Sequence, residues 1–256
     1  GSTNAWVDGV RITKGVARYL EDGITIPTDS LTNDSDTLFL MNCDRDYIDR
    51  GSFDLAIQKT GPAELLPYSP FSETGNVANS ILFTPYNWYS TPHSTDFNLG
   101  TNFTVDFWLF RPSTATGSFA VMAKPYSIDI YFTNYQGYVS LGNNGTGFNL
   151  RQGWPGWPET SLDEWTHYMM SREGNIVRFL KSGTIVNTIS LSSSAALATN
   201  TSNLMIGSST ETGSRTEHGI IHGLRINNNV ALGANTYDVP EVEYVIPGGD
   251  TSNVLL

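Results

Sequence analysis

The feature that most constrains the fold is a two-residue alternation of apolar side chains in segment 103–109. Phe103, Val105, Phe107 and Leu109 fall on one face, and the residues between them on the other. A period of two is that of a β-strand with one buried face, whereas a helix would repeat every 3.6 residues. We therefore expect a strand here, with Phe103, Val105 and Phe107 facing the core.

Further short segments have strand character and are separated by turn residues. The candidate strands are 127–132, 165–170, 176–181, 184–190, 204–207 and 219–226. Ser182-Gly183 predicts a hairpin turn, and helical character is confined to one possible turn at 194–198. Many short strands with no helices between them predict an all-β fold of antiparallel sheets, a sandwich or a barrel. We expect two packed sheets over about residues 34–232.

Charge and composition exclude several classes of function. The 256 residues carry a formal net charge of −11, and an acidic surface repels phosphate, so we expect no nucleic-acid partner. The acidity serves solubility or supplies oxygen-rich cation sites. Cys43 is the one cysteine, which excludes an intrachain disulfide framework and a cysteine-based zinc site. No apolar run reaches the ~18 residues of a membrane helix, so we expect no membrane insertion.

The two ends of the chain resemble each other. Residues 5–12 and 219–226 share a Gly-x-Arg-Ile core at an offset of 214 (222 − 8). Residues 34–40 resemble residues 250–256 at an offset of 216 (250 − 34). Two matches in the same order predict a parent chain that repeats a unit of this length. The alternative is that 5–12 and 219–226 are two similar strands of one sheet.

The repeat predicts a division of the chain. Residues 1–33 would be the end of a preceding repeat plus a linker, residues 34–240 the sandwich domain, and residues 241–256 a linker and the first strand of a following repeat. Since residues 5–12 would lack their own sandwich, we expect them on the outside as an added edge strand. Neighbouring repeats are then partners, and exchange of the ends is a route to a homo-oligomer.

Four segments together indicate a family. They are 96–108 with its Phe-Thr-Val-Asp-Phe-Trp strand, Trp165-Thr166-His167, the hairpin 174–183, and Ile206-Gly207-Ser208 leading to 219–226. In order and spacing the chain resembles the laminin-G-like (concanavalin A-like) jelly-roll repeats of bacteriophage virion and tail-associated proteins. The resemblance implies a two-sheet antiparallel jelly-roll sandwich at a virion or other extracellular surface. Members of this family often carry an acid in the closing strand that helps to bind calcium; His222 stands there, and Ser182 replaces the usual hairpin Asn.

The same sandwich carries glycoside hydrolases, which need two carboxylates ~5–9.5 Å apart. Two candidate strands offer one acid each, Asp106 in 103–109 and Asp129 in 127–132. A pair across neighbouring strands is the remaining catalytic arrangement, since Glu241 and Glu243 lie in the proline-flanked end. No nucleophile elbow, His-Glu-x-x-His motif or phosphate loop is present. We therefore expect no catalytic residues and no enzyme.

The best candidate for ligand binding is the segment Gln152-Gly153-Trp154-Pro155-Gly156-Trp157-Pro158. Proline does not fit a central strand, so we expect a loop that displays Trp154 and Trp157 as a sugar-stacking platform. Arg151, Gln152 and Asn149 would bond sugar hydroxyls. The alternative is that one or both tryptophans cover the core edge. Residues 86–89 (Tyr-Asn-Trp-Tyr) have the same ambiguity.

Cation binding depends on an acidic cluster. Asp44, Asp46 and Asp49 precede a glycine, and Ca²⁺ prefers 6–8 oxygen ligands. The interleaved Arg45 and Arg50 argue against a site because they can pair with the same acids. We expect no cofactor other than, at most, calcium near these aspartates, and no calcium on the imidazole of His222.

Three functions compete. The first is a non-catalytic carbohydrate-binding or adhesion module that binds a glycan or host-surface polysaccharide. The second is a structural spacer or decoration repeat of a phage tail or capsid fibre without a ligand. The third, more remote, is a glycoside hydrolase. An exposed Trp154 and Trp157 would favour the first function, and burial of both would favour the second.

Overall fold

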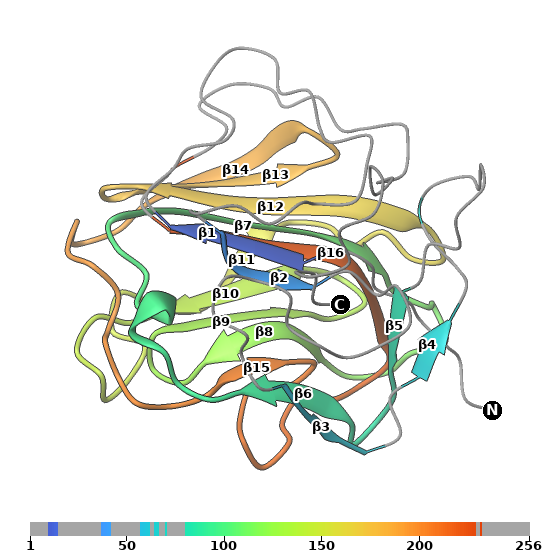
Figure 1. Cartoon of the computed structure of the whole chain (residues 1–256). Coiled ribbons are helices and arrows are strands. Elements are labelled where there is room, and N and C mark those ends of the chain that lie inside the picture. Colours follow the sequence, from blue (N-terminus) through green and yellow to red (C-terminus); the bar gives the residue numbers. More distant parts are fainter. Residues whose placement is uncertain are drawn as a thin grey trace, which may run out of the picture.

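The computed structural model describes residues 10–14, 37–41, 57–61, 64–66, 70, 80–228 and 231. These residues form two β-sheets packed face to face (Figure 1). The nine-stranded sheet contains β1 (Val10–Lys14), β2 (Thr37–Met41), β4 (Glu64–Leu66), β5 (Ser80–Phe83), β7 (Asn102–Phe110), β12 (Trp165–Glu173), β13 (Ile176–Lys181), β14 (Thr184–Ser190) and β16 (Gly219–Asn228). The seven-stranded sheet contains β3 (Gln58–Thr60), β6 (Trp88–Thr91), β8 (Phe119–Lys124), β9 (Ile128–Phe132), β10 (Gly137–Leu141), β11 (Arg151–Trp157) and β15 (Leu204–Ile206).

Strand order confirms the expected sandwich. The nine-stranded sheet runs β14-β13-β12-β7-β16-β1-β2, with β5 and β4 attached to β16, and the seven-stranded sheet runs β11-β10-β9-β8-β15-β6-β3. Every described strand pair except β1–β16 is antiparallel. One 3₁₀ turn, η1 (Thr95–Phe97), is the helical element of the described residues, and segment 194–198 is irregular instead of helical.

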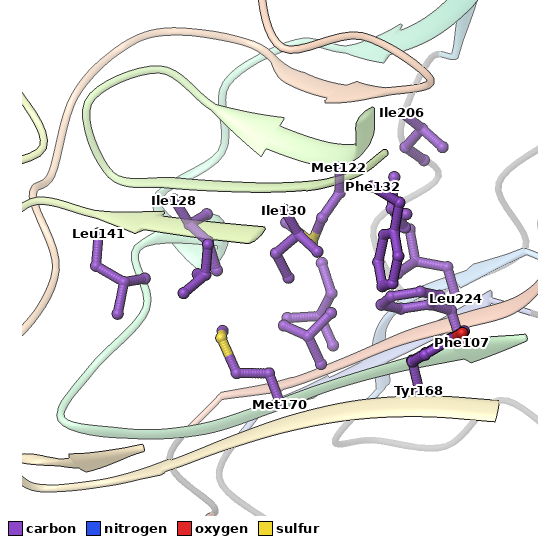
Figure 2. Packing of buried hydrophobic residues seen from close by; sticks show 14 of the residues in the cluster. Phe107, Met122, Ile128, Ile130, Phe132, Leu141, Tyr168, Met170, Ile206 and Leu224 are labelled. Carbon is purple, nitrogen blue, oxygen red and sulfur yellow. The ribbon is translucent and has the colours of Figure 1, made fainter. Parts of the chain in front are cut away.

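The core lies between the sheets, as the alternation in β7 predicts. Phe103, Val105 and Phe107 are completely buried. The facing sheet contributes Phe132, which meets the Phe107 ring edge-on with ring centroids 5.9 Å apart. Figure 2 shows these two rings with Tyr168 between the layers. Because burial of one such side chain contributes roughly 1.5–3 kcal/mol, this layer is a major source of stability.

Polar residues of the core-forming strands β7 and β9 lie on the outer faces of the two sheets. Asp106 lies in the nine-stranded sheet and Asp129 in the seven-stranded sheet, each between core-facing neighbours. Side chains alternate across a strand, so the two carboxylates point away from each other on opposite outer faces. An Asp106–Asp129 catalytic pair across neighbouring strands does not form. His167 is a hydrogen-bonded structural residue, with its Nε2 3.2 Å from the Asp106 Oδ2.

The first strand contradicts the expectation of an outermost added strand. β1 pairs in parallel with β16, with Ile12 opposite Ile226, and β2 lies beyond it (Figure 1). The described end of the first segment, residues 10–12, therefore lies beside β16 in one sheet, which favours the alternative. Residues 5–9 and 250–256 lie outside the described residues, and the boundaries 1–33, 34–240 and 241–256 stay predictions.

Candidate functional site

The tryptophan segment is a strand rather than the expected loop. Residues 151–157 form β11, the edge of the seven-stranded sheet, next to β10. Proline has no backbone N–H to donate. An edge strand tolerates Pro155 because one side of the strand has no neighbouring strand that would need this hydrogen bond. The exclusion of a central strand was therefore right, and the prediction of a loop was wrong.

The β10–β11 pairing has two register shifts, and the one at Ser140 decides to which side of β11 Arg151 and Trp154 point. Trp154 pairs with Val139 and Arg151 with Leu141, so two residues of β11 lie opposite Ser140 alone. Gly153, one of those two, has φ +57° and donates its backbone N–H to the Ser140 Oγ at 2.9 Å. A β-bulge of this kind rotates the following side chains. Arg151 and Trp154 therefore share one side of β11, although they are three positions apart.

Trp157 is part of the core and is removed from the predicted platform. Its side chain is 0% exposed, and the indole Nε1 donates to the Leu180 carbonyl at 2.8 Å. The ring stacks on Phe132 with centroids 5.2 Å apart and meets Phe179 edge-on at 5.0 Å. Gly137 makes room for it, because a Cβ at that position would lie 2.7 Å from the indole. This ring cannot stack on a sugar.

Trp154, unlike Trp157, is exposed. The residue is 40% exposed, and the Arg151 guanidinium carbon lies 4.5 Å from the centre of its ring. Arg151 in turn donates through Nη2 to the carbonyl of Ser190 at 3.1 Å, at the end of β14 in the opposite sheet. The structure therefore brings the exposed Trp154 and the partly buried Arg151 together.

The edge strands β11 and β14 are joined on both sides of Trp154. The Asn187 amide of β14 donates to the carbonyls of Pro155 and Gly156, each at 3.1 Å. Together with the Arg151–Ser190 bond, this contact holds the backbone before and after the indole. We call the unit formed by Arg151, Trp154 and Asn187 the Trp154 platform. These contacts hold the strand on both sides of the ring, and preorganisation of this kind lowers the ordering cost of binding.

The other predicted polar residues lie apart from this platform. Gln152 is exposed and, with Gly153, lies opposite Ser140, on the side of β11 away from the indole. Asn149 is exposed, but its amide accepts from the Asn143 backbone N–H at 2.9 Å and donates to the Asn143 side chain at 2.7 Å. Asn149 therefore stabilises the β10–β11 loop.

The second aromatic patch, residues 86–89, is divided between surface and core. Tyr86 is 79% exposed, whereas Tyr89 is completely buried. Asn87 is also buried and closes the turn by donating to the Thr84 Oγ1 at 2.6 Å. Trp88 is partly buried, so Tyr86 is the one fully exposed ring of the patch.

A group of residues that the sequence analysis missed lies on the outer face of the seven-stranded sheet. The Arg215 guanidinium carbon lies 3.8 Å from the centre of the Tyr131 ring. Tyr131 and Tyr138 are cross-strand neighbours whose rings are 5.0 Å apart and inclined by 8°. We call Tyr131, Tyr138 and Arg215 the tyrosine ledge. The alternation in 128–132 is a signal for an outward Tyr131, but nothing local points to Arg215, which is 84 positions later (215 − 131).

A buried carboxylate supports the tyrosine ledge. Asp129 is 2% exposed, accepts from the Ser209 Oγ at 2.8 Å and forms an ion pair with Arg215 at 2.5 Å. Burial raises the pKa of Asp129 to about 6, although Arg215 and Ser209 oppose the shift. At neutral pH the carboxylate is therefore mostly ionised and balances the charge of Arg215.

The predicted metal ligands cannot be placed. Asp44, Asp46 and Asp49 lie outside the described residues, so calcium near them stays a prediction. Within the described residues, no three His, Cys, Asp or Glu side chains form a group that could hold a metal ion. His222 is completely buried, and burial holds its pKa well below the usual value.

The side chain of Lys124 is hydrogen-bonded to the loop that precedes β15. Lys124 is completely buried, and its Nζ donates to the carbonyls of Asn200 and Ser202, each at 2.9 Å. Burial lowers the pKa of this ammonium to about 8.

The described part of the chain contains no helix of the length and hydropathy needed to span a membrane.

Comparisons with known proteins agree with this architecture. Residues 83–235 match the family described as the concanavalin A-like lectin/glucanases superfamily. No curated protein matches the chain. Similar solved structures include the binding domain of Paraclostridial Mosquitocidal Protein 1 (TM-score 0.53, 12% identity) and that of botulinum neurotoxin DC in complex with SialylT (0.53, 11%). A structure of botulinum neurotoxin type C, whose cell entry depends on interaction with two ganglioside molecules, has a TM-score of 0.56 at 12% identity.

These similarities concern the fold. Each of the three covers 76% of this chain but 48% of the solved chain, so this sequence spans about half of the structures that it resembles. None of them involves a bacteriophage protein.

Proposed function

Because the chain belongs to the concanavalin A-like lectin/glucanase superfamily, we propose that it is a non-catalytic carbohydrate-binding module in which a sugar stacks on Trp154. The observation that carries the proposal is the Trp154 platform, a 40% exposed indole that is held against Arg151. The proposed location is an extracellular surface. A virion or tail fibre is the context that the resemblance of the sequence suggests.

The chemistry of the platform suits a sugar ring. An indole presents a large, rigid apolar face at little entropic cost, and the CH groups of a pyranose pack on such a face. Arg151 has five N–H donors, of which one Nη2 bond goes to the Ser190 carbonyl. Nε of Arg151 is buried, so the remaining Nη donors are the ones that can bond hydroxyl groups. Stacking of one ring should contribute ~1–3 kcal/mol, by analogy with base–aromatic stacking.

Two observations favour binding over catalysis. The two acids that the sequence offered for hydrolysis, Asp106 and Asp129, lie in different sheets. Each is committed to a neighbour, Asp106 to His167 at 3.2 Å and Asp129 to Arg215 at 2.5 Å. The similar structure of botulinum neurotoxin type C, whose cell entry depends on interaction with two ganglioside molecules, also supports a glycan as the ligand.

A glycan array tests the proposal. We expect the protein to bind one or more glycans, with or without calcium, and Trp154→Ala to lower that affinity about tenfold or more with little loss of stability. Trp157→Phe is the matched control, because it changes the buried indole of the same strand and should leave binding unchanged. A folded Trp154→Ala protein with unchanged binding would refute the platform. The absence of any bound glycan would favour the structural spacer.

A further inference from the structure

The tyrosine ledge is a surface that the Trp154 platform does not use. It lies on the outer face of the seven-stranded sheet, where Tyr131 and Tyr138 alternate with the core residues Ile130 and Val139. Both tyrosines are partly exposed. A Cβ at Gly153 would lie 3.3 Å from the Tyr131 hydroxyl, so the ledge reaches across β10 to β11. Gln152, the exposed residue before Gly153, lies at this end of the ledge.

The loop between β15 and β16 holds Arg215 in place. The Arg215 carbonyl accepts from the Ala120 backbone N–H at 2.8 Å, on β8, while β10 lies on the other side of β9. Arg215 has φ +56°, a backbone conformation that costs free energy in a non-glycine residue. The bonds to Asp129 and Ser209 offset this cost and fix the guanidinium over the Tyr131 ring. The ledge is therefore preorganised on a strand and a clamped loop.

Polar groups surround the two rings. The Tyr138 hydroxyl donates to the Gln136 Oε1 at 3.0 Å, which leaves the amide nitrogen of Gln136 at the surface as a donor. Nη1 of Arg215 makes the bonds to Asp129 and Ser209 that the structure describes, so other donors of this guanidinium remain. Aromatic faces flanked by amide and guanidinium donors suit a ligand with apolar CH groups and many hydroxyls.

The charge of the ledge selects among such ligands. Asp129 balances Arg215, and the whole chain carries a formal net charge of −11. A carboxylated or sulfated sugar would be repelled by this field and would find no uncompensated cation on the ledge. A neutral sugar loses nothing to this repulsion.

We propose that the tyrosine ledge is a second carbohydrate-binding site, for a neutral sugar unit, with Tyr138 as the stacking ring and Gln136, Gln152 and Arg215 as hydrogen-bond partners. It lies across β11 from the Trp154 platform and does not require that platform to bind anything. The two sites together would give the module two points of attachment to one polysaccharide, which increases its avidity.

The test is a nuclear magnetic resonance titration of the isotope-labelled chain with four neutral hexasaccharides, those of cellulose, starch, chitin and mannan. One or more of them should shift the backbone amides of residues 131–138 and 152–153. Tyr138→Ala should weaken that binding about tenfold, and Trp154→Ala should leave these particular shifts in place. Tyr138→Phe is the matched control, since it keeps the ring and should keep most of the affinity.

Three outcomes would overturn the second site. In the first, none of the hexasaccharides shifts these amides at concentrations up to about 10 mM. In the second, a folded Tyr138→Ala protein binds with unchanged affinity. In the third, Trp154→Ala abolishes all shifts, which would leave the Trp154 platform as the one binding site. Conversely, shifts at the ledge that survive Trp154→Ala support the second site even if the first proposal fails.

The pH dependence of the preference between acidic and neutral sugars is an independent test of the second site. Since the pKa of Asp129 is about 6, protonation at pH 5 leaves Arg215 without its counter-charge. Sialyllactose should then gain affinity for the ledge relative to lactose, and the gain should be absent in Asp129→Asn, where the charge does not change with pH. An equal preference at pH 5 and pH 7.5 in the unmodified chain would contradict the role of charge in selecting a neutral ligand.

Discussion

Trp154 and Trp157 belong to one strand and one short motif, yet they have opposite environments. Trp157 is 0% exposed and is surrounded by core rings, whereas Trp154 is 40% exposed beside Arg151. In a regular strand, residues three apart point to opposite faces. Here the register shifts of β11 and its place at the sheet edge decide which ring is covered. The comparison teaches that a pair of tryptophans in a motif does not predict a pair of tryptophans in a site.

The largest expected effect is the loss of the buried ring. Trp157→Ala should lower the free energy of unfolding by about 3–5 kcal/mol, because it leaves a large cavity and an unpaired Leu180 carbonyl. Trp154→Ala should cost well under about 1 kcal/mol, as a surface substitution does. Chemical denaturation of both variants measures the difference. Equal losses would mean that the two rings are not in different environments.

Asp129 provides a second contrast with Trp157. Both side chains are buried, but Asp129 lies on the outer face of its sheet and is covered by the loop that carries Arg215. Its pKa is raised from 3.8 to about 6, so its contribution to stability is complete below pH 3.8 and is lost as the pH rises through 6. Asp129→Asn should therefore gain stability relative to the unmodified chain between pH 4 and pH 7, by on the order of 2 kcal/mol.

The stability difference between these two proteins, followed by denaturation from pH 4 to pH 7, isolates this carboxyl from the other acids. Asparagine keeps a side-chain oxygen for Ser209 and Arg215. A difference that does not change with pH would show that the pKa of Asp129 is not raised in the folded state.

Gly153 tests whether the bulge separates the two rings. Its φ of +57° is unfavourable for any residue with a Cβ, and a Cβ there would lie 3.3 Å from the Tyr131 hydroxyl. Gly153→Ala should therefore cost about 1–2 kcal/mol and weaken glycan binding at Trp154. Gly174→Ala, a substitution at φ +58° with no atom within 4 Å, is the matched control for the backbone cost alone. The same loss of glycan affinity in both variants would contradict a specific role of the bulge.

The sequence predicted the parts of the fold that local periodicity determines. The alternation in 103–109 correctly assigned Phe103, Val105 and Phe107 to the core, and the hairpin 176–190 forms around Ser182, which has φ +46°. Periodicity failed where proline and bulges interrupt it, so residues 152–158 were assigned to a loop, although 151–157 form β11. It also could not show that β1 pairs with β16, because strand pairing is a long-range property.

The candidate site was predictable to the same limited extent. Arg151 and Trp154 are close in sequence and do meet, whereas Trp157 was misplaced because the register of β11 is not visible in its composition. The tyrosine ledge was missed because Arg215 reaches Tyr131 and Asp129 through a loop from another part of the chain. Contacts of this kind depend on the folded topology and leave no local pattern.

The smallest expected effect concerns Arg151, which supports the exposed ring without being buried with it. A cation over an exposed aromatic face contributes ~0.5–1 kcal/mol, and the bond to the Ser190 carbonyl adds a similar small amount. Arg151→Ala should therefore leave Trp154 in place but less ordered, and lower glycan affinity about threefold to tenfold.

Arg151→Lys sharpens this test, because lysine keeps the positive charge but has no planar group to stack on the indole. If stacking orders the ring, the lysine variant should bind almost as weakly as the alanine variant, as measured by calorimetric titration with a glycan identified on the array. If lysine restores the full affinity, charge alone accounts for the role of Arg151. The difference between Trp154 and Trp157 would then depend on the strand register and not on the arginine beside the exposed ring.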